Sequence, residues 1–159
     1  MTTVFLHGLE SSSRGTKGSW FRQHFPKMLV PDFTGSLRDR MDQLNRVLTG
    51  RKELLLVGSS FGGLMAAILA IENPERVSRL ILLAPALNFP EFDKWHGRST
   101  PVETLLYIGG NDDVCPPAVV IPAAKAAFPA LTIHQTDDDH LLRATFAEID
   151  WQCLLGQRG

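Results

Sequence analysis

The sequence lacks the features that mark several large classes of protein. It has only two cysteines, Cys115 and Cys153, among 159 residues, which are too few for a disulfide framework or a zinc site. Its 16 basic and 17 acidic side chains leave a formal net charge of −1, and the basic residues are scattered along the chain. We therefore expect no nucleic-acid partner and no attraction to anionic lipid.

Long apolar runs, targeting signals and repeats are also missing. The longest apolar stretch, Leu64 to Ile71, is far too short to span a bilayer, and residues 1–6 do not resemble a secretory signal. No repeat, low-complexity tract or linker divides the chain. A hydrophobic content of 44% is typical of a globular protein with a core. We therefore expect a single domain over residues 1–159, located in the cytoplasm and not associated with a membrane.

Six apolar segments recur along the chain, with helix-like segments between them. Leu54–Val57 and Leu80–Leu83 are continuous apolar runs, which are typical of strands buried on both faces in a parallel sheet. The predicted strands are Thr3–Leu6, Lys27–Val30, Glu53–Val57, Arg79–Leu83, Thr104–Ile108 and Leu131–Gln135.

The intervening segments have the periodicity of helices. Residues 62–72 are apolar nearly all round, which indicates a buried helix that ends before Pro74. We expect another helix to begin near Pro122, because proline is tolerated at the first helical position. Two further helices are predicted from apolar stripes, one from Leu37, Met41, Leu44 and Leu48 and a C-terminal one from Leu142, Phe146, Ile149 and Cys153.

Alternating strands and helices predict an α/β fold, a doubly wound parallel sheet covered by helices in a three-layer αβα sandwich. Ligands in such folds bind beyond the carboxyl ends of the strands. The loops that follow each strand are therefore the places to look for chemistry.

The loop after the third predicted strand reads Gly58-Ser59-Ser60-Phe61-Gly62. This G-x-S-x-G pattern, between an apolar strand and an apolar helix, is typical of a nucleophile elbow, in which a sharp turn exposes the middle serine. The alternatives are an ordinary glycine-rich turn or a phosphate-binding loop, but the usual phosphate-loop patterns are absent. We predict Ser60 as a nucleophile.

A serine nucleophile needs a base, and two histidines lie late enough in the chain to supply it. His134 falls within the last predicted strand and is expected to be structural. His140 follows that strand, in a loop from which an imidazole can reach Ser60. We predict His140 as the general base.

The base in turn needs a carboxylate that orients it. Asp112, in the loop after the fifth predicted strand, is the preferred candidate, with Asp113 expected to point elsewhere and Asp93 as a third possibility. The alternative for this Asn-Asp-Asp cluster is an Asx turn.

An oxyanion needs two hydrogen-bond donors. We predict the backbone N–H groups of Phe61 and of Leu9, in the loop after the first strand, where Gly8 permits a sharp turn. His7 is expected to brace this loop. The alternative is that residues 7–13 form a flexible serine-rich connector.

Taken together, these motifs resemble those of the α/β-hydrolase superfamily, and in particular of its small, lidless, single-domain bacterial esterases. Phe5-Leu6-His7-Gly8 resembles the oxyanion loop, residues 58–62 the elbow, residues 109–116 the acid loop and Asp139-His140 the histidine loop. The order Ser, Asp, His is that of the family. The resemblance implies an open sheet of about six strands in the order 2-1-3-4-5-6 without a cap domain, and it places Cys115 where valine is more usual.

The function implied is that of a serine hydrolase acting on small or short-acyl carboxylic esters or thioesters, with no cofactor and no metal. Phe89, Phe92 and Trp95 are candidates for lining an acyl pocket, although such aromatic residues also often cover a core. A thioesterase, amidase or acyltransferase would use the same residues. A non-catalytic protein on this fold is a further alternative. The sequence leaves the oligomeric state open.

Overall fold

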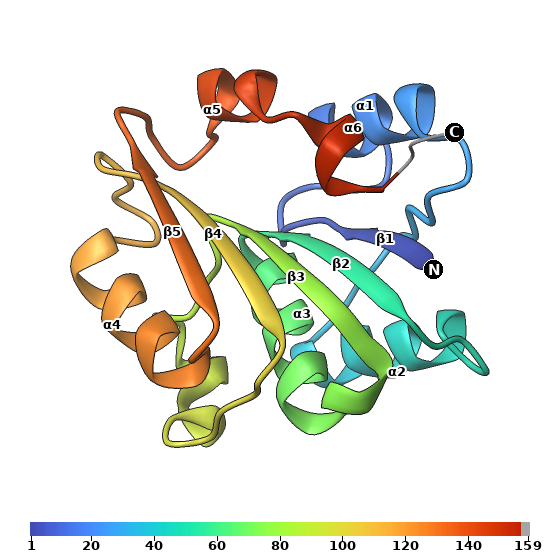
Figure 1. Cartoon of the computed structure of the whole chain (residues 1–159), viewed down its shortest axis with the longest axis horizontal. Helices are drawn as coiled ribbons and strands as arrows, with labels where there is room; N and C mark the ends of the chain where they lie inside the picture. The colour runs from blue at the N-terminus through green and yellow to red at the C-terminus, as the bar shows by residue number, and fades with distance from the viewer. Residues whose placement is uncertain (157–159) are drawn as a thin grey trace.

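The computed structural model describes residues 1–156. Five strands alternate with helices along this part of the chain (Figure 1). The elements are β1 (Thr2–Leu6), α1 (Thr16–His24), α2 (Leu37–Val47), β2 (Leu54–Ser59), α3 (Phe61–Glu72), η1 (Pro74–Arg76), β3 (Val77–Leu83), η2 (Pro90–Trp95), β4 (Glu103–Gly109), α4 (Pro117–Ala127), β5 (Leu131–Thr136), α5 (Arg143–Glu148) and α6 (Trp151–Leu154).

The five strands form one parallel sheet in the order β1-β2-β3-β4-β5. The predicted parallel sheet and the predicted neighbours of these five strands are therefore confirmed. Because all strands run the same way, the loops after β1, β2, β4 and β5 emerge at one edge of the sheet. The predicted nucleophile, base, acid and oxyanion donors all lie in these loops or directly beside them.

The predicted second strand, Lys27–Val30, forms only a single bridge. Leu29 pairs with Val4 of β1 in the parallel sense, and the Leu29 N–H donates to the Thr3 carbonyl over 2.9 Å. The segment lies beside β1, where the predicted order places it. It does not extend further because Pro26 and Pro31 flank it, and proline has no N–H to donate to a ladder.

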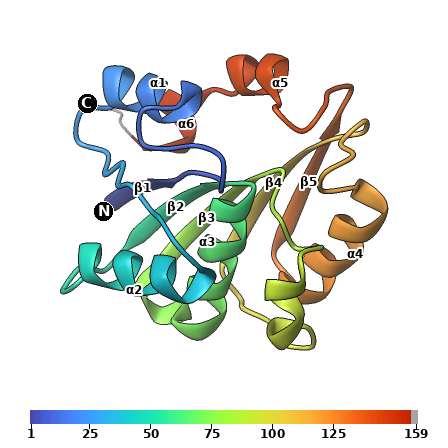
Figure 2. The same ribbon diagram turned by 180° about the vertical axis from the view of Figure 1, so that it is seen from behind.

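Each strand sends successive side chains to opposite faces, and helices cover both faces (Figures 1 and 2). Leu54 and Leu56 of β2 belong to the cluster that packs under α2, α3 and α4. Leu55 and Val57 belong to a second cluster, which packs under α1 and α6. The continuous apolar runs in the sequence thus reflect burial on both faces, and the three-layer architecture is confirmed.

The helices predicted from residues 37–48 and 62–72 are present as α2 and α3. Ser36 caps α2, since its side chain accepts from the Asp39 N–H while the Asp39 carboxylate accepts from the Ser36 N–H. Residues 61–71 of α3 are all buried, so α3 lies in the middle of its layer.

The helix after β4 does not begin near Pro122, contrary to the prediction. Helix α4 begins at Pro117 and contains Pro122 in its interior. Pro122 removes one helical N–H, which would have paired with the Ala118 carbonyl. Both residues are exposed, so water can satisfy that carbonyl and the helix continues.

The prediction of a single C-terminal helix is also wrong, because the chain forms two short helices there, α5 and α6. Ile149 has an extended backbone, and the Asp150 side chain accepts from the Cys153 N–H and starts α6. Cys153 is exposed, whereas Trp151 is buried. The aspartate cap restarts the helix and rotates the buried stripe away from Cys153.

Among residues 1–156, no helix is both long enough and apolar enough to cross a membrane.

The aromatic cluster between the sheet and α1 is expected to contribute strongly to stability. Phe21 is fully buried, and its ring lies 5.0 Å from that of Phe5 and 4.9 Å from that of Trp151. Phe21→Ala should lower the free energy of unfolding by about 3–5 kcal/mol, measured by urea denaturation. Val119→Ala, at a side chain that is 52% exposed, is the control and should change it by less than about 0.5 kcal/mol. Equal effects of the two changes would contradict this assignment of the core.

Candidate active site

Ser60 lies in a sharp turn between β2 and α3. Its φ is +54° and its ψ is −116°, a backbone conformation that L-residues rarely adopt. The Ser60 N–H donates to the Leu83 carbonyl over 2.9 Å, which ties the turn to β3. A Cβ on Gly58 would lie 2.5 Å from the Gly62 carbonyl oxygen, so the turn needs glycine at position 58. The elbow predicted from the pattern is present.

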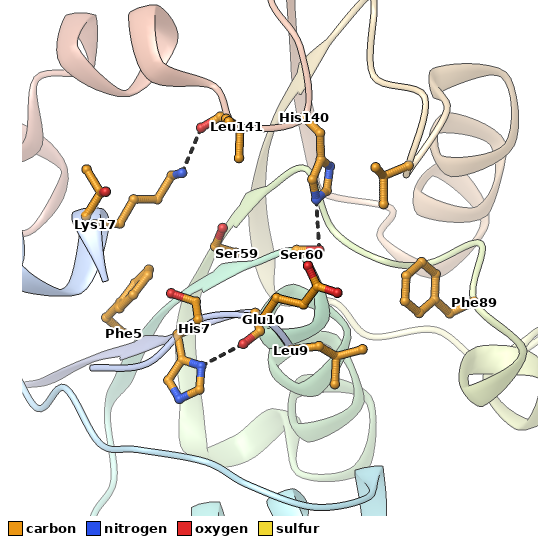
Figure 3. A pocket seen from close by; sticks show the side chains of 14 residues that line it. Phe5, His7, Leu9, Glu10, Lys17, Ser59, Ser60, Phe89, His140 and Leu141 are labelled. Carbon is orange, nitrogen blue, oxygen red and sulfur yellow. Dashed lines mark hydrogen bonds between the residues drawn. The ribbon is translucent and has the colours of Figure 1, made fainter. Parts of the chain in front are cut away.

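His140 connects this serine to a carboxylate. Its Nε2 lies 3.1 Å from the Ser60 Oγ (Figure 3), and its Nδ1 lies 2.8 Å from the Asp112 Oδ2. An ionised carboxylate only accepts, so Nδ1 carries the proton and Nε2 is free to accept from the serine hydroxyl. The three predicted side chains are therefore brought into one hydrogen-bond chain.

Both carboxylate oxygens of Asp112 accept hydrogen bonds, which hold the side chain in place. Its carboxylate is fully buried, and Oδ1 accepts from the N–H groups of Val114 and Cys115 over 2.9 and 2.7 Å. The Asx turn weighed as an alternative for this cluster is thus formed by Asp112 itself, which leaves Oδ2 directed at His140. Asp113 is exposed, and Asp93 lies in η2 beside His96 instead.

The acid loop and the histidine loop are also joined through their backbones. The Gly110 N–H donates to the Thr136 carbonyl over 2.7 Å, and the Asn111 N–H donates to the Asp138 carbonyl over 3.0 Å. A Cβ on Gly109 would overlap the Asp138 carbonyl. This close approach holds Asp112 and His140 at a fixed separation.

Asp138 anchors the histidine loop to the start of α5. Its Oδ2 accepts from the Thr145 N–H over 3.0 Å and from the Thr145 hydroxyl over 2.8 Å. Burial raises the pKa of Asp138, but these hydrogen bonds outweigh it and hold the pKa below the ordinary aspartate value. The carboxylate therefore stays ionised and keeps its partners.

The loop after β1 lies against the serine. The Gly8 backbone is so close that a Cβ there would lie 3.4 Å from the Ser60 Cβ. His7 is buried and braces the loop as expected, because its Nδ1–H donates to the Gly8 carbonyl over 2.7 Å and its Nε2 accepts from the Phe33 N–H over 2.9 Å. Among residues 1–156, no hydrogen bond uses the N–H of Leu9 or Phe61. Within the described residues both N–H groups are therefore unpaired.

Comparison with known proteins agrees with this geometry. The profile of the alpha/beta hydrolase fold family matches residues 6–100, which is more than half of the chain. This chain belongs to the alpha/beta hydrolase family. The match ends before Asp112 and His140, so the placement of these two side chains in this hydrolase rests on the structure. A search of curated protein sequences finds no match.

Several solved structures superpose on 98% of this chain. A predicted CIB-like hydrolase from Thermoplasma acidophilum shares 20% identity at a TM-score of 0.76, over 98% of this chain and 86% of that one. Alpha/beta hydrolase domain-containing protein 10 from mouse shares 18% identity, and Est1E from Butyrivibrio proteoclasticus, solved with ferulic acid, shares 15%. Both have a TM-score of 0.76 over 98% of this chain and 88% of theirs. At these identities the similarity shows the fold.

Ser60 lines a pocket of about 490 Å³ (Figure 3). This volume is within the usual range for small-molecule sites. Several of its apolar side chains are exposed at the surface, including Leu9, Val114 and Leu141. The lining is Phe5, His7, Gly8, Leu9, Glu10, Ser11, Thr16, Lys17, Ser59, Ser60, Phe89, Val114, His140 and Leu141.

Of the three aromatic residues predicted for an acyl pocket, only Phe89 lines it. Phe92 is buried in the core under α3, and Trp95 packs against that core and donates its Nε1–H to Glu72 over 3.0 Å. The prediction is therefore wrong for Phe92 and Trp95. Both lie in the 3₁₀ turn η2, which directs them toward the core.

Cys115, which stands where valine is more usual in the family, also lies at this site. Its sulfur lies within 4.8 Å of the donor atoms of Asp112 and His140, an arrangement that could in principle bind a metal. Burial, reinforced by the Asp112 carboxylate and opposed by a hydrogen bond with Ser60, raises the pKa of the Cys115 thiol to about 12. Because a metal binds the thiolate, and the other two groups already bind each other, these residues suit a hydrogen-bond chain better than a metal site.

The two cysteines should therefore differ in reactivity. Cys115 is buried and its thiol stays protonated at pH 8, whereas Cys153 is exposed. Iodoacetamide at pH 8 should modify Cys153 in the native protein and leave Cys115 unmodified, as measured by mass spectrometry of the peptides. In denaturant both should react. Rapid native modification of Cys115 would contradict its burial.

Proposed function

We propose that this protein is a serine hydrolase that cleaves small carboxylic esters through an acyl-enzyme on Ser60. The observation that carries the proposal is the continuous hydrogen-bond chain from Asp112 to His140 and Ser60, with distances of 2.8 and 3.1 Å, in the wall of an open pocket. A serine in such a chain can lose its proton as it attacks, which an isolated serine hydroxyl does poorly.

In the first half of the reaction, the Ser60 Oγ attacks the acyl carbonyl carbon while its proton passes to the His140 Nε2. The N–H groups of Leu9 and Phe61 bind the oxyanion of the tetrahedral intermediate. The bond to the alkoxy oxygen then breaks, and the imidazolium returns the proton to the departing alcohol. Asp112 is the orienting acid that holds the ring and stabilises its charged form.

In the second half, a water molecule takes the place of the alcohol. His140 accepts a proton from this water as it attacks the acyl-enzyme, and the collapse of the second intermediate returns that proton to Ser60. The products are a carboxylic acid and an alcohol. No step uses a cofactor.

The pocket favours a small or short-acyl substrate. Phe89 and Val114 give it an apolar side, and η2 with its adjoining turns supplies too few residues for a cap. Thioesters and amides are acyl compounds that the same groups can attack, so esters, thioesters and amides of one acyl chain should be compared directly. We place the reaction in the cytoplasm, where thiols such as the free Cys115 and Cys153 stay reduced.

Ser60→Ala should abolish ester hydrolysis, with kcat/KM falling by about 10⁴-fold or more, because the variant has no hydroxyl to acylate. A fluorophosphonate probe should label Ser60 in the wild-type protein, identified by peptide mass spectrometry. Ser59→Ala is the matched control, since Ser59 is adjacent but lies outside the hydrogen-bond chain, and it should still be labelled. Unimpaired turnover by Ser60→Ala would refute the mechanism.

Asp112→Asn should lower kcat/KM by about 10²–10⁴-fold. The asparagine oxygen can still accept from Val114 and Cys115, but the side chain then presents an NH₂ to His140 Nδ1. The ring must then carry its proton on Nε2, which can no longer accept from Ser60. Asp113→Asn, at the exposed neighbour, should leave kcat/KM within about twofold of the wild type. Equal losses in both variants would count against Asp112 as the orienting acid.

A further inference from the structure

The pocket has two chemically different sides. Figure 3 shows Lys17 and Phe89 on opposite sides of Ser60. Phe89 places an aromatic ring on one side, whereas the other side holds the Lys17 ammonium and the Ser59 hydroxyl together with the apolar side chains of Phe5 and Leu141. A substrate that spans Ser60 therefore meets an apolar surface at one end and a cation at the other.

The positive charge of the Lys17 ammonium group is not neutralised by an ion pair among the described residues. Lys17, in the first turn of α1, is half-buried. Its Nζ donates to the Leu141 carbonyl over 2.7 Å and lies 5.7 Å from the centroid of the Phe146 ring. Within residues 1–156 no carboxylate oxygen lies within 4.0 Å of this nitrogen. A lysine ammonium carries three donors, so the cation has donors left for a ligand in the pocket.

The surroundings of Lys17 disfavour its charge. Burial lowers the pKa of Lys17, and the nearby Arg143 lowers it further, while Asp138 and Asp139 act in the opposite direction without cancelling the shift. An anion bound at the Nζ would offset this lost solvation, since an opposite charge stabilises a partly buried cation.

We propose that Lys17 binds a carboxylate on the substrate, so that the preferred esters carry an anionic group at the α1 side of the pocket and an apolar group at the Phe89 side. This rests on the proposed function, because it names the substrate class of the reaction at Ser60. A carboxylate matches the ammonium in charge and adds a charge-assisted hydrogen bond.

Glu10 restricts where that anion can lie. It also lines the pocket, and Figure 3 shows its carboxylate away from Lys17. Glu10 is exposed, so water and salt screen its charge. An anionic group is therefore accepted beside Lys17 and disfavoured beside Glu10.

The competing explanation is that Lys17 only positions the histidine loop through the Leu141 carbonyl. Lys17→Gln and Lys17→Arg together separate the two roles, because the first keeps a side-chain N–H donor without the charge and the second keeps the charge. Loss of a positioning contact would slow all esters alike, whereas loss of the cation would slow only anionic ones.

The test uses two pairs of esters in which a carboxylate is matched by an uncharged amide of the same shape. In the first pair the group is on the acyl chain (monoethyl glutarate against ethyl glutaramate). In the second it is on the alcohol (2-butyryloxyacetate against 2-butyryloxyacetamide). The wild-type kcat/KM should favour the carboxylate member of at least one pair by about 10- to 100-fold. The pair that shows the preference identifies which end of the ester faces Lys17.

Lys17→Gln should bring the ratio of kcat/KM for the carboxylate member to that for the amide member close to one, and Lys17→Arg should retain most of the preference. Lys125→Gln, at an exposed lysine of α4 outside the pocket, is the charge-matched control and should behave as the wild type. No preference in either pair, or an equal loss for both members in Lys17→Gln, would overturn the proposal while leaving Ser60 catalysis intact.

A second measurement does not depend on ester turnover. Two fluorophosphonates, one ending in a carboxylate and one in an amide, should inactivate the wild type at rates that differ in the same direction, and Lys17→Gln should remove the difference. Failure of Ser60 to react with either probe would instead refute the proposed function. Reaction at equal rates would refute only the role of Lys17.

Discussion

The hydrogen bond between the Asp112 carboxylate and the His140 ring is the contact on which the rest of the site depends. It joins loops that follow two neighbouring strands, β4 and β5. The loops can meet there because a glycine at the end of β4 lets their backbones touch. With the ring held at this point, its second nitrogen faces the turn after β2, and the two strands that separate β2 from β5 set the distance that the imidazole must bridge.

Much of this arrangement could be predicted from the sequence because its determinants are local. The G-x-S-x-G turn needs glycines at fixed positions, so its pattern is visible without any knowledge of the fold. The apolar runs of β2 and β3 follow from burial on both faces. Asp112 and His140 could be chosen because parallel strands bring their following loops to one edge, so position relative to a strand end carried the information. Their separation could not be predicted, since it depends on how closely the two loops pack.

The features that could not be predicted depend on packing between distant segments. Phe92 and Trp95 are aromatic residues near the pocket in sequence, but the direction of η2 places them against the core, and no local pattern distinguishes them from Phe89. The interior Pro122 is tolerated only because the face of α4 that it occupies is exposed. Lys17 belongs to no motif and reaches the pocket through the packing of α1 against the histidine loop, some 120 residues later in the chain. The sequence marks Cys115 only as a departure from valine, because its place beside Asp112 and His140 depends on the turn that Asp112 builds.

The position of β5 at the edge of the sheet affects the order in which parts of the protein unfold. Within residues 1–156, β5 pairs only with β4 and so forms one edge of the sheet, and three of its six residues are exposed while the other three are half-buried. Edge segments with few buried contacts open at lower free energy than central strands. The loop that carries His140 is attached to this edge, whereas Ser60 is attached to the centre. Warming or mild denaturant should thus disconnect the imidazole while the central strands remain folded, so that heat inactivation precedes melting of the core.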